Sequence, residues 1–131
     1  MLNGAERRIH QRYTLPSSYT EIAIRPFDKD EFNLMGHAYD ISEGGIRFEL
    51  DQPIEPGTRI GIRIMLPRAT MTQTTEKRAI FAMGNLVWTN HDDIELGGPI
   101  RMACTITRFM QPGDLEMLRR ALESGRYALA A

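Results

Sequence analysis

One segment near the middle of the chain has a large aliphatic residue at every second position. Over positions 59–66 the sequence reads Arg-Ile-Gly-Ile-Arg-Ile-Met-Leu. Successive side chains of a β-strand point to opposite faces, so this pattern predicts a strand with one buried face. Residues 46–50 and 102–107 alternate in the same way, and residues 22–26, the run that ends at 41 and residues 78–89 also read as strands. The chain therefore predicts about six strands.

Short turn sequences separate these strands, and no helical period lies between them. The period changes only near the C-terminus, where Leu115, Leu118 and Leu122 predict one amphipathic helix. Residues 90–93 are expected to form a polar turn, and residues 97–99 a bend. Consecutive strands joined by turns imply an antiparallel sheet, and six strands can avoid exposed edges by closing into a barrel. We expect the helix to pack against one mouth or side of that barrel.

Length and charge set limits on domain number and on partners. The 131 residues suit one domain, divided into a flexible arm (1–18), a barrel with its helix (19–125) and a tail (126–131). The net charge of −1 provides no general field for nucleic acid. One cysteine and no apolar run of membrane-spanning length predict a cytoplasmic protein without membrane contact.

The N-terminal arm carries a cluster of arginines. Arg7, Arg8 and Arg12 lie within six residues of each other. Guanidinium groups bind phosphate with two hydrogen bonds, stack on bases and recognise the O6 and N7 edge of guanine. Arginine clusters in N-terminal tails are most often only solvated, so this cluster is not specific alone.

A second cluster lies between two predicted strands, in the sequence Asp40-Ile41-Ser42-Glu43-Gly44-Gly45. The Asp40 carboxylate can accept hydrogen bonds from N1 and N2 of guanine, and the Ser42 hydroxyl can bond phosphate or base. Gly44 and Gly45 permit positive φ or a close backbone approach. An ordinary turn has the same composition, which is the alternative interpretation.

Taken together and in order, the two clusters resemble the signature of a known family. Arg8-x-x-x-Arg12 followed by Asp40-x-Ser42-x-x-Gly45 is similar to the two-part motif of PilZ domains, which bind the bacterial second messenger cyclic di-GMP. Residues 84–88 also resemble a later PilZ strand, and the resemblance spans roughly residues 6–124. The sequence departs from the family over residues 97–102, outside both motifs.

The resemblance implies a six-stranded antiparallel β-barrel, the PilZ split barrel, with a C-terminal helix. Its ligand would lie on the outer barrel surface between the arginine arm and the hairpin. Arg8 and Arg12 would contact guanines and phosphates, while Asp40, Ser42 and Gly45 would hold a base and the ring. Arg7 matches the position that helps some members bind a stacked ligand pair, which leaves one or two cyclic di-GMP molecules open.

The predicted function is a cyclic di-GMP receptor that changes conformation on binding and thereby regulates a protein partner. No enzyme motif, cofactor or metal site is predicted, because His10, His37 and His91 lack ligand spacing. Cys104 is expected to be a small buried apolar residue. The alternative function is a PilZ-like adaptor that works by protein contact without ligand.

Trp88 has two interpretations. As the last apolar residue of a strand it can flank the ligand, or it can pack in the core or at the barrel rim. Its neighbourhood in the folded chain decides between them.

Overall fold

The computed structural model describes residues 13–14, 20–67, 77–123 and 128–129, and strands make up most of these ranges. In chain order the elements are β1 (Tyr13–Thr14), β2 (Glu21–Pro26), β3 (Leu34–Ile41), β4 (Gly45–Leu50), β5 (Arg59–Pro67), β6 (Lys77–Thr89), α1 (His91–Leu96), β7 (Ile100–Phe109), α2 (Asp114–Glu123) and β8 (Ala128–Leu129). The six strands and the C-terminal helix expected from the sequence correspond to β2 to β7 and α2.

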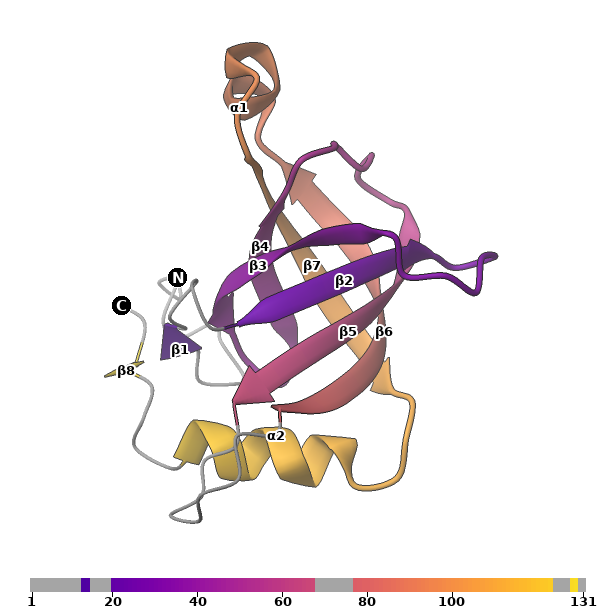
Figure 1. Cartoon of the computed structure of the whole chain (residues 1–131), viewed down its shortest axis with the longest axis vertical. Helices are drawn as coiled ribbons and strands as arrows, with labels where there is room; N and C mark the ends of the chain where they lie inside the picture. Colours follow the sequence, from indigo (N-terminus) through magenta and orange to yellow (C-terminus); the bar gives the residue numbers. More distant parts are fainter. Residues whose placement is uncertain (1–12, 15–19, 68–76, 124–127, 130–131) are drawn as a thin grey trace, which may run out of the picture.

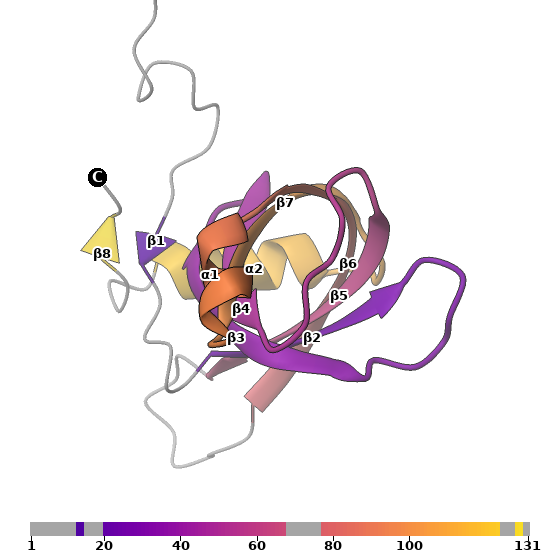
Figure 2. The ribbon, with the colours of Figure 1, turned by 90° about the horizontal axis from the view of Figure 1, so that it is seen from above.

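The six longer strands close into an antiparallel barrel (Figures 1 and 2). Around the barrel the order is β2, β5, β6, β7, β4, β3, and β3 pairs again with β2. Closure pairs the edges that an open sheet would leave exposed. The predicted fold class is confirmed.

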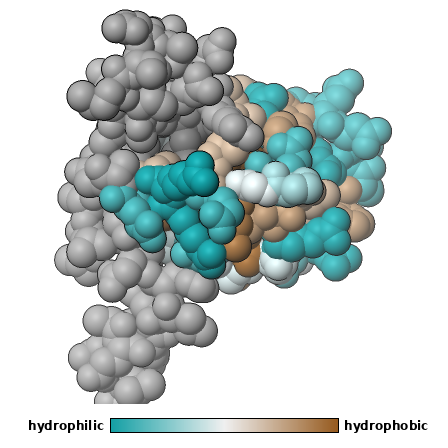
Figure 3. All heavy atoms as spheres, turned by 90° about the horizontal axis from the view of Figure 1, so that it is seen from below, coloured by the Kyte–Doolittle hydropathy of each residue, from teal (hydrophilic) through white to brown (hydrophobic). Residues whose placement is uncertain are grey.

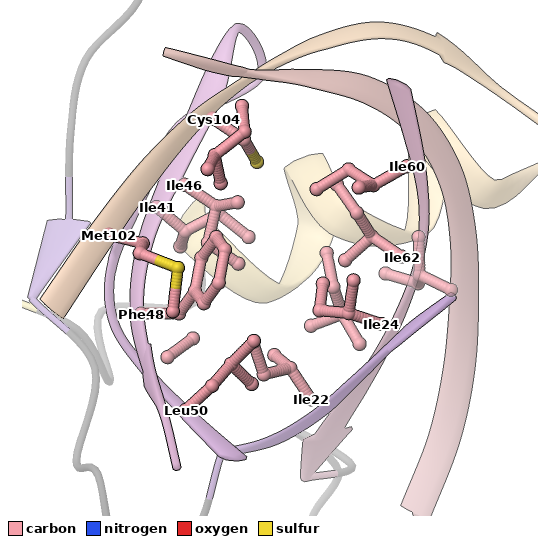
Figure 4. Close-up of a cluster of buried hydrophobic side chains, with 14 of the residues drawn as sticks. Ile22, Ile24, Ile41, Ile46, Phe48, Leu50, Ile60, Ile62, Met102 and Cys104 are labelled. Carbon is pink, nitrogen blue, oxygen red and sulfur yellow. The ribbon is translucent and has the colours of Figure 1, made fainter. Parts of the chain in front are cut away.

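Alternating apolar side chains fill the barrel. In β4, Ile46, Phe48 and Leu50 are buried while Arg47 is exposed. Figure 4 shows such side chains from opposite walls converging on the interior, with Phe48 facing Ile24 and Ile62 across it. Burial of each large apolar side chain stabilises the fold by about 1.5–3 kcal/mol, so this interior is the main source of stability.

Helix α2 covers one end of the barrel, as expected (Figure 1). Leu118, Ala121 and Leu122 are buried against the core. The buried Asp114 accepts a hydrogen bond from the backbone N–H of Phe81 at 3.0 Å, which ties the first turn of α2 to β6. Figure 3 looks onto this end and shows hydrophilic residues beside smaller hydrophobic areas, as expected for a helix with one buried side.

The turn predicted over residues 90–93 is wrong, because the chain forms the short helix α1 there. The Asn90 side chain accepts a hydrogen bond from the Asp93 N–H and caps the helix at its start. Gly97 ends it with a φ of 77°. Asp93 is buried, and both its carboxylate oxygens accept hydrogen bonds from Arg101 of β7.

Two short strands form outside the barrel, in segments where the sequence predicts none. β1 pairs with the end of β3, placing Tyr13 opposite Ile41 and Thr14 opposite Asp40. β8 then pairs with β1. A two-residue strand is too short to show an alternating pattern, so only tertiary pairing reveals it.

Candidate functional site

The hairpin between β3 and β4 contains the second predicted cluster. The Ser42 N–H donates to the Gly45 carbonyl at 2.9 Å and closes the turn. The Gly44 N–H donates to the Ser42 hydroxyl oxygen at 3.2 Å. The Ser42 side chain is buried, and its hydroxyl stabilises the turn by accepting this hydrogen bond.

Gly45 is explained by close packing of two strands. A Cβ atom on Gly45 would lie 2.9 Å from the carbonyl oxygen of Cys104 on β7. Its φ is not in the left-handed region, so close approach is the reason for glycine at this position. The hairpin therefore sits against β7, and the Gly44 carbonyl also accepts from the Ile106 N–H at 2.9 Å.

Asp40 belongs to a row of residues on the outer wall of the barrel. It lies opposite Arg47 of β4, and Arg47 lies opposite Ala103 of β7. Ala103 in turn lies opposite Trp88 of β6. Ile41 and the residues that flank Arg47 and Ala103 are buried, so Asp40, Arg47 and Ala103 face outward, and Trp88 is itself exposed. We call Asp40, Arg47, Ala103 and Trp88 the outer row.

Trp88 is 45% exposed, which excludes packing in the core and leaves two interpretations, packing at the barrel rim and contact with a ligand. A β-bulge between Leu86 and Trp88 sets its register against Ala103. The bulge gives β6 one extra residue, which turns Trp88 to the outer wall. A small alanine beside it leaves part of the indole open to solvent.

Sequence reasoning missed Arg47. It is exposed on β4, opposite Asp40. Burial raises the pKa of Tyr39 on β3, and the positive charge of Arg47 partly opposes this rise. The alternation of β4 shows that Arg47 points outward, but only the strand register places it beside Asp40.

The tip of the hairpin is joined to α2 by an ion pair. Both Nε and Nη2 of Arg119 donate to Oε1 of Glu43, at 3.0 and 2.9 Å. This hydrogen-bonded pairing raises the pKa of Arg119. A displacement of the hairpin would therefore act directly on the C-terminal helix.

Arg7, Arg8 and Arg12 lie outside the described residues. Tyr13, which follows Arg12 in the sequence, begins β1 and pairs with Ile41 at the base of the hairpin. The structure thus places Asp40 and Trp88 in the outer row, and Ser42 and Gly45 in the hairpin that follows Asp40.

Cys104, the one cysteine of the chain, lies inside the barrel. Cys104 is buried as expected, and burial raises the pKa of its thiol to about 12, which disfavours the nucleophilic thiolate. In the described part of the chain, no group of three or more His, Cys, Asp or Glu residues could hold a metal ion. Over the same residues, no helix has the length and apolar character that crossing a membrane requires.

Comparison with known proteins matches one family model, and the solved structures that resemble this chain include two described below. The family model for the PilZ domain matches residues 6–124. The structure of the Bacillus subtilis inhibitor of motility, MotI/DgrA, has a TM-score of 0.63 at 18% identity and covers 94% of this chain. This chain spans 55% of that protein, or about half its length. No curated protein sequence matches.

The second structure is the PilZ domain of YcgR from Escherichia coli, solved with c-di-GMP. It has a TM-score of 0.60 at 17% identity, and the match covers 90% of each chain. At these identities the two structures share the fold with this chain.

Proposed function

The chain belongs to the PilZ domain family, and from this premise we propose that it is a receptor for cyclic di-GMP that regulates a partner protein. The observation that carries the proposal is that Asp40, at the base of the Asp40-x-Ser42-x-x-Gly45 hairpin, lies in the same outward-facing row as Trp88. β1, which follows the Arg8-x-x-x-Arg12 motif, pairs with the base of the same hairpin.

The chemistry of this wall suits a guanine dinucleotide. Asp40 accepts from the N1 and N2 donors of a guanine, while Trp88 offers a face on which a base stacks. Arg8, Arg12 and Arg47 supply guanidinium groups for the two phosphates. Gly45 keeps β4 close to β7, so the ligand lies on a flat wall without a protruding side chain at that position.

Binding would be transmitted through the hairpin. Its tip is bonded to α2 by the Glu43–Arg119 pair, and its turn is bonded to β7 through the Gly44 carbonyl. A ligand that draws Asp40 and Ser42 toward the arginines also pulls on these connections. The surfaces of β7 and α2 then change, and a partner protein senses that change.

The test is calorimetric titration of the full chain with cyclic di-GMP, which reports both affinity and stoichiometry. Charge-assisted hydrogen bonds contribute about 1.5–3 kcal/mol each, so Arg8→Ala should weaken binding about tenfold or more. Arg108→Ala is the matched control, because Arg108 is an exposed arginine on β7 away from the hairpin. Absence of binding by the unaltered chain would overturn the receptor proposal and favour the ligand-independent adaptor.

A further inference from the structure

A second surface of the barrel has the composition of a binding site. A pocket of about 480 Å³ lies over the outer faces of β5, β6 and β7, beside the loop that follows β2. We call it the arginine pocket. Its charged and apolar lining includes Arg25, Phe27, Arg59, Met83, Arg108 and Met110.

Arg25 builds the rim of the arginine pocket. Its guanidinium donates to the carbonyl oxygens of Phe27 at 3.1 Å and Lys29 at 2.6 Å, which fixes the loop after β2. The side chain crosses β5 above Gly61, where a Cβ atom would lie 2.8 Å from the Arg25 Nε. It ends 3.8 Å from the sulfur of Met83. The rim is therefore preorganised by hydrogen bonds that leave Arg25 little capacity for a ligand.

Arg59 and Arg108 remain available. The guanidinium of Arg59 lies 4.8 Å from the centre of the Phe27 ring. Among the described residues, neither Arg59 nor Arg108 forms an ion pair. Asp30 is the one acidic residue in the pocket lining, so cationic groups dominate there. An anionic group would find two guanidinium forks without first breaking an ion pair.

The apolar part of the arginine pocket is exposed. Phe27 is 52% and Met110 is 39% exposed, although both could bury this surface against another molecule. Aromatic residues, Met and Arg are the types enriched in protein interfaces, and Arg and aromatic residues are frequent among the residues that dominate binding energy. Apolar area beside free guanidiniums fits a peptide that carries carboxylates and one apolar side chain.

We propose that the arginine pocket binds an acidic segment of a partner protein, with one aromatic or aliphatic side chain packed against Phe27 and Met110. The inference deepens the proposed function, since it rests on the partner protein assigned there and names its chemistry. The pocket is separate from the hairpin, because β7 lies between Gly45 of β4 and Asn85 of β6. Ligand and partner can therefore occupy neighbouring parts of one wall.

The test is an NMR titration of the ¹⁵N-labelled full chain with the synthetic peptide acetyl-Asp-Glu-Asp-Phe-Glu-Asp-amide. We expect the largest amide shifts at Met83, Asn85 and Thr107, and weaker binding at higher salt because exposed charges are screened. The Arg59→Gln/Arg108→Gln double variant should bind at least about fivefold more weakly, corresponding to the loss of about 1 kcal/mol. Arg120→Gln, an exposed arginine on α2, is the matched control.

Three results would overturn the inference. The first is that the peptide produces amide shifts centred outside the arginine pocket, and the second is that the double variant and the control bind the peptide equally well. The third is that inorganic phosphate at the same concentration produces equal amide shifts. The last result would identify a small-anion site. A peptide with lysines in place of the acids should give no shifts there.

Calorimetry with cyclic di-GMP on the same double variant separates the two proposals. The double variant should retain full affinity for cyclic di-GMP, because neither Arg59 nor Arg108 belongs to the outer row. If the unaltered chain binds cyclic di-GMP but not the peptide, the partner inference alone is wrong. If it binds the peptide but not cyclic di-GMP, the receptor proposal is wrong and the adaptor function stands.

Discussion

Ser42 shows how one residue of a ligand motif can also be a structural residue. Its hydroxyl accepts from the Gly44 N–H inside the hairpin turn. Ser42→Ala should lower the free energy of unfolding by about 1 kcal/mol, the usual net value of such a bond. Urea denaturation measures this loss, and Ser42→Thr, which keeps a hydroxyl, should restore most of it. Equal stability of the alanine variant and the unaltered chain would show that the bond contributes nothing.

Substitution of Arg47 tests whether the outer row binds the ligand. Arg47→Ala should weaken cyclic di-GMP binding about threefold to thirtyfold, because it removes one guanidinium from the phosphate side of the wall. Titration calorimetry measures the change, and Arg120→Ala on α2 is the control. Because Arg47 is exposed, its removal should leave the unfolding midpoint nearly unchanged. Unaltered affinity would exclude Arg47 from the site.

The residues of the two motifs could be selected from the sequence, but their neighbours could not. Asp40 and Ser42 combine polar chemistry with a turn, which a sequence displays directly. Arg47 and Ala103 become neighbours of Asp40 and Trp88 only through strand register. A bulge of one residue in β6 decides which way Trp88 points, and local composition does not specify bulges.

At the scale of elements, α1 depends on one carboxylate. Asp93 accepts from the Arg101 backbone N–H at 3.0 Å and from its Nε at 2.8 Å. These hydrogen bonds lower the pKa of Asp93. A lowered pKa in the folded state stabilises the fold above the ordinary aspartate pKa, and that contribution is lost as the pH falls through the folded value.

Asp93→Asn should therefore lower the melting temperature at neutral pH. The melting temperature of the variant should also decrease less on acidification than that of the unaltered chain. Thermal unfolding between pH 7 and about pH 2 measures both effects, because this range extends well below the ordinary aspartate pKa of about 3.9. Asp92→Asn is the control, since Asp92 is exposed on the same helix turn. Parallel pH profiles for Asp93→Asn and the unaltered chain would contradict this account of α1.

The ion pair between the hairpin and α2 couples two elements far apart in the sequence. Arg119→Ala should leave the melting temperature nearly unchanged, because exposed ion pairs stabilise folds little. It should instead speed hydrogen exchange at the Ser42 amide, since the hairpin loses its attachment to α2. Arg120→Ala alters the neighbouring exposed residue and should change neither quantity. Unchanged exchange in Arg119→Ala would show that α2 does not restrain the hairpin.

At the scale of the whole molecule, strand count followed from alternation but barrel closure did not. β4, β5 and β7 each have a buried face that their own sequence displays. Closure depends on β2 pairing with both β3 and β5, which is a property of the assembled chain. The seam between β2 and β3 joins four residue pairs, whereas β5 and β6 share nine. The short seam makes the β2–β3–β4 region the place where closure is most easily disturbed.

Gly36 lies at this seam, opposite Ile22 of β2 and Leu50 of β4. A Cβ atom there would overlap the carbonyl oxygen of Glu49, so β4 would have to move away from β3. Gly36→Ala should therefore destabilise the fold by about 2 kcal/mol, as crowding in packed proteins usually does. Gly98→Ala is the matched control, because a Cβ atom at Gly98 meets nothing within 4 Å.

Urea denaturation compares the stability of the two variants. Barrel closure also positions the hairpin, so Gly36→Ala should weaken cyclic di-GMP binding, whereas Gly98→Ala should leave it intact. Equal stability of the two variants would mean that the seam tolerates a wider spacing and that closure does not depend on this glycine.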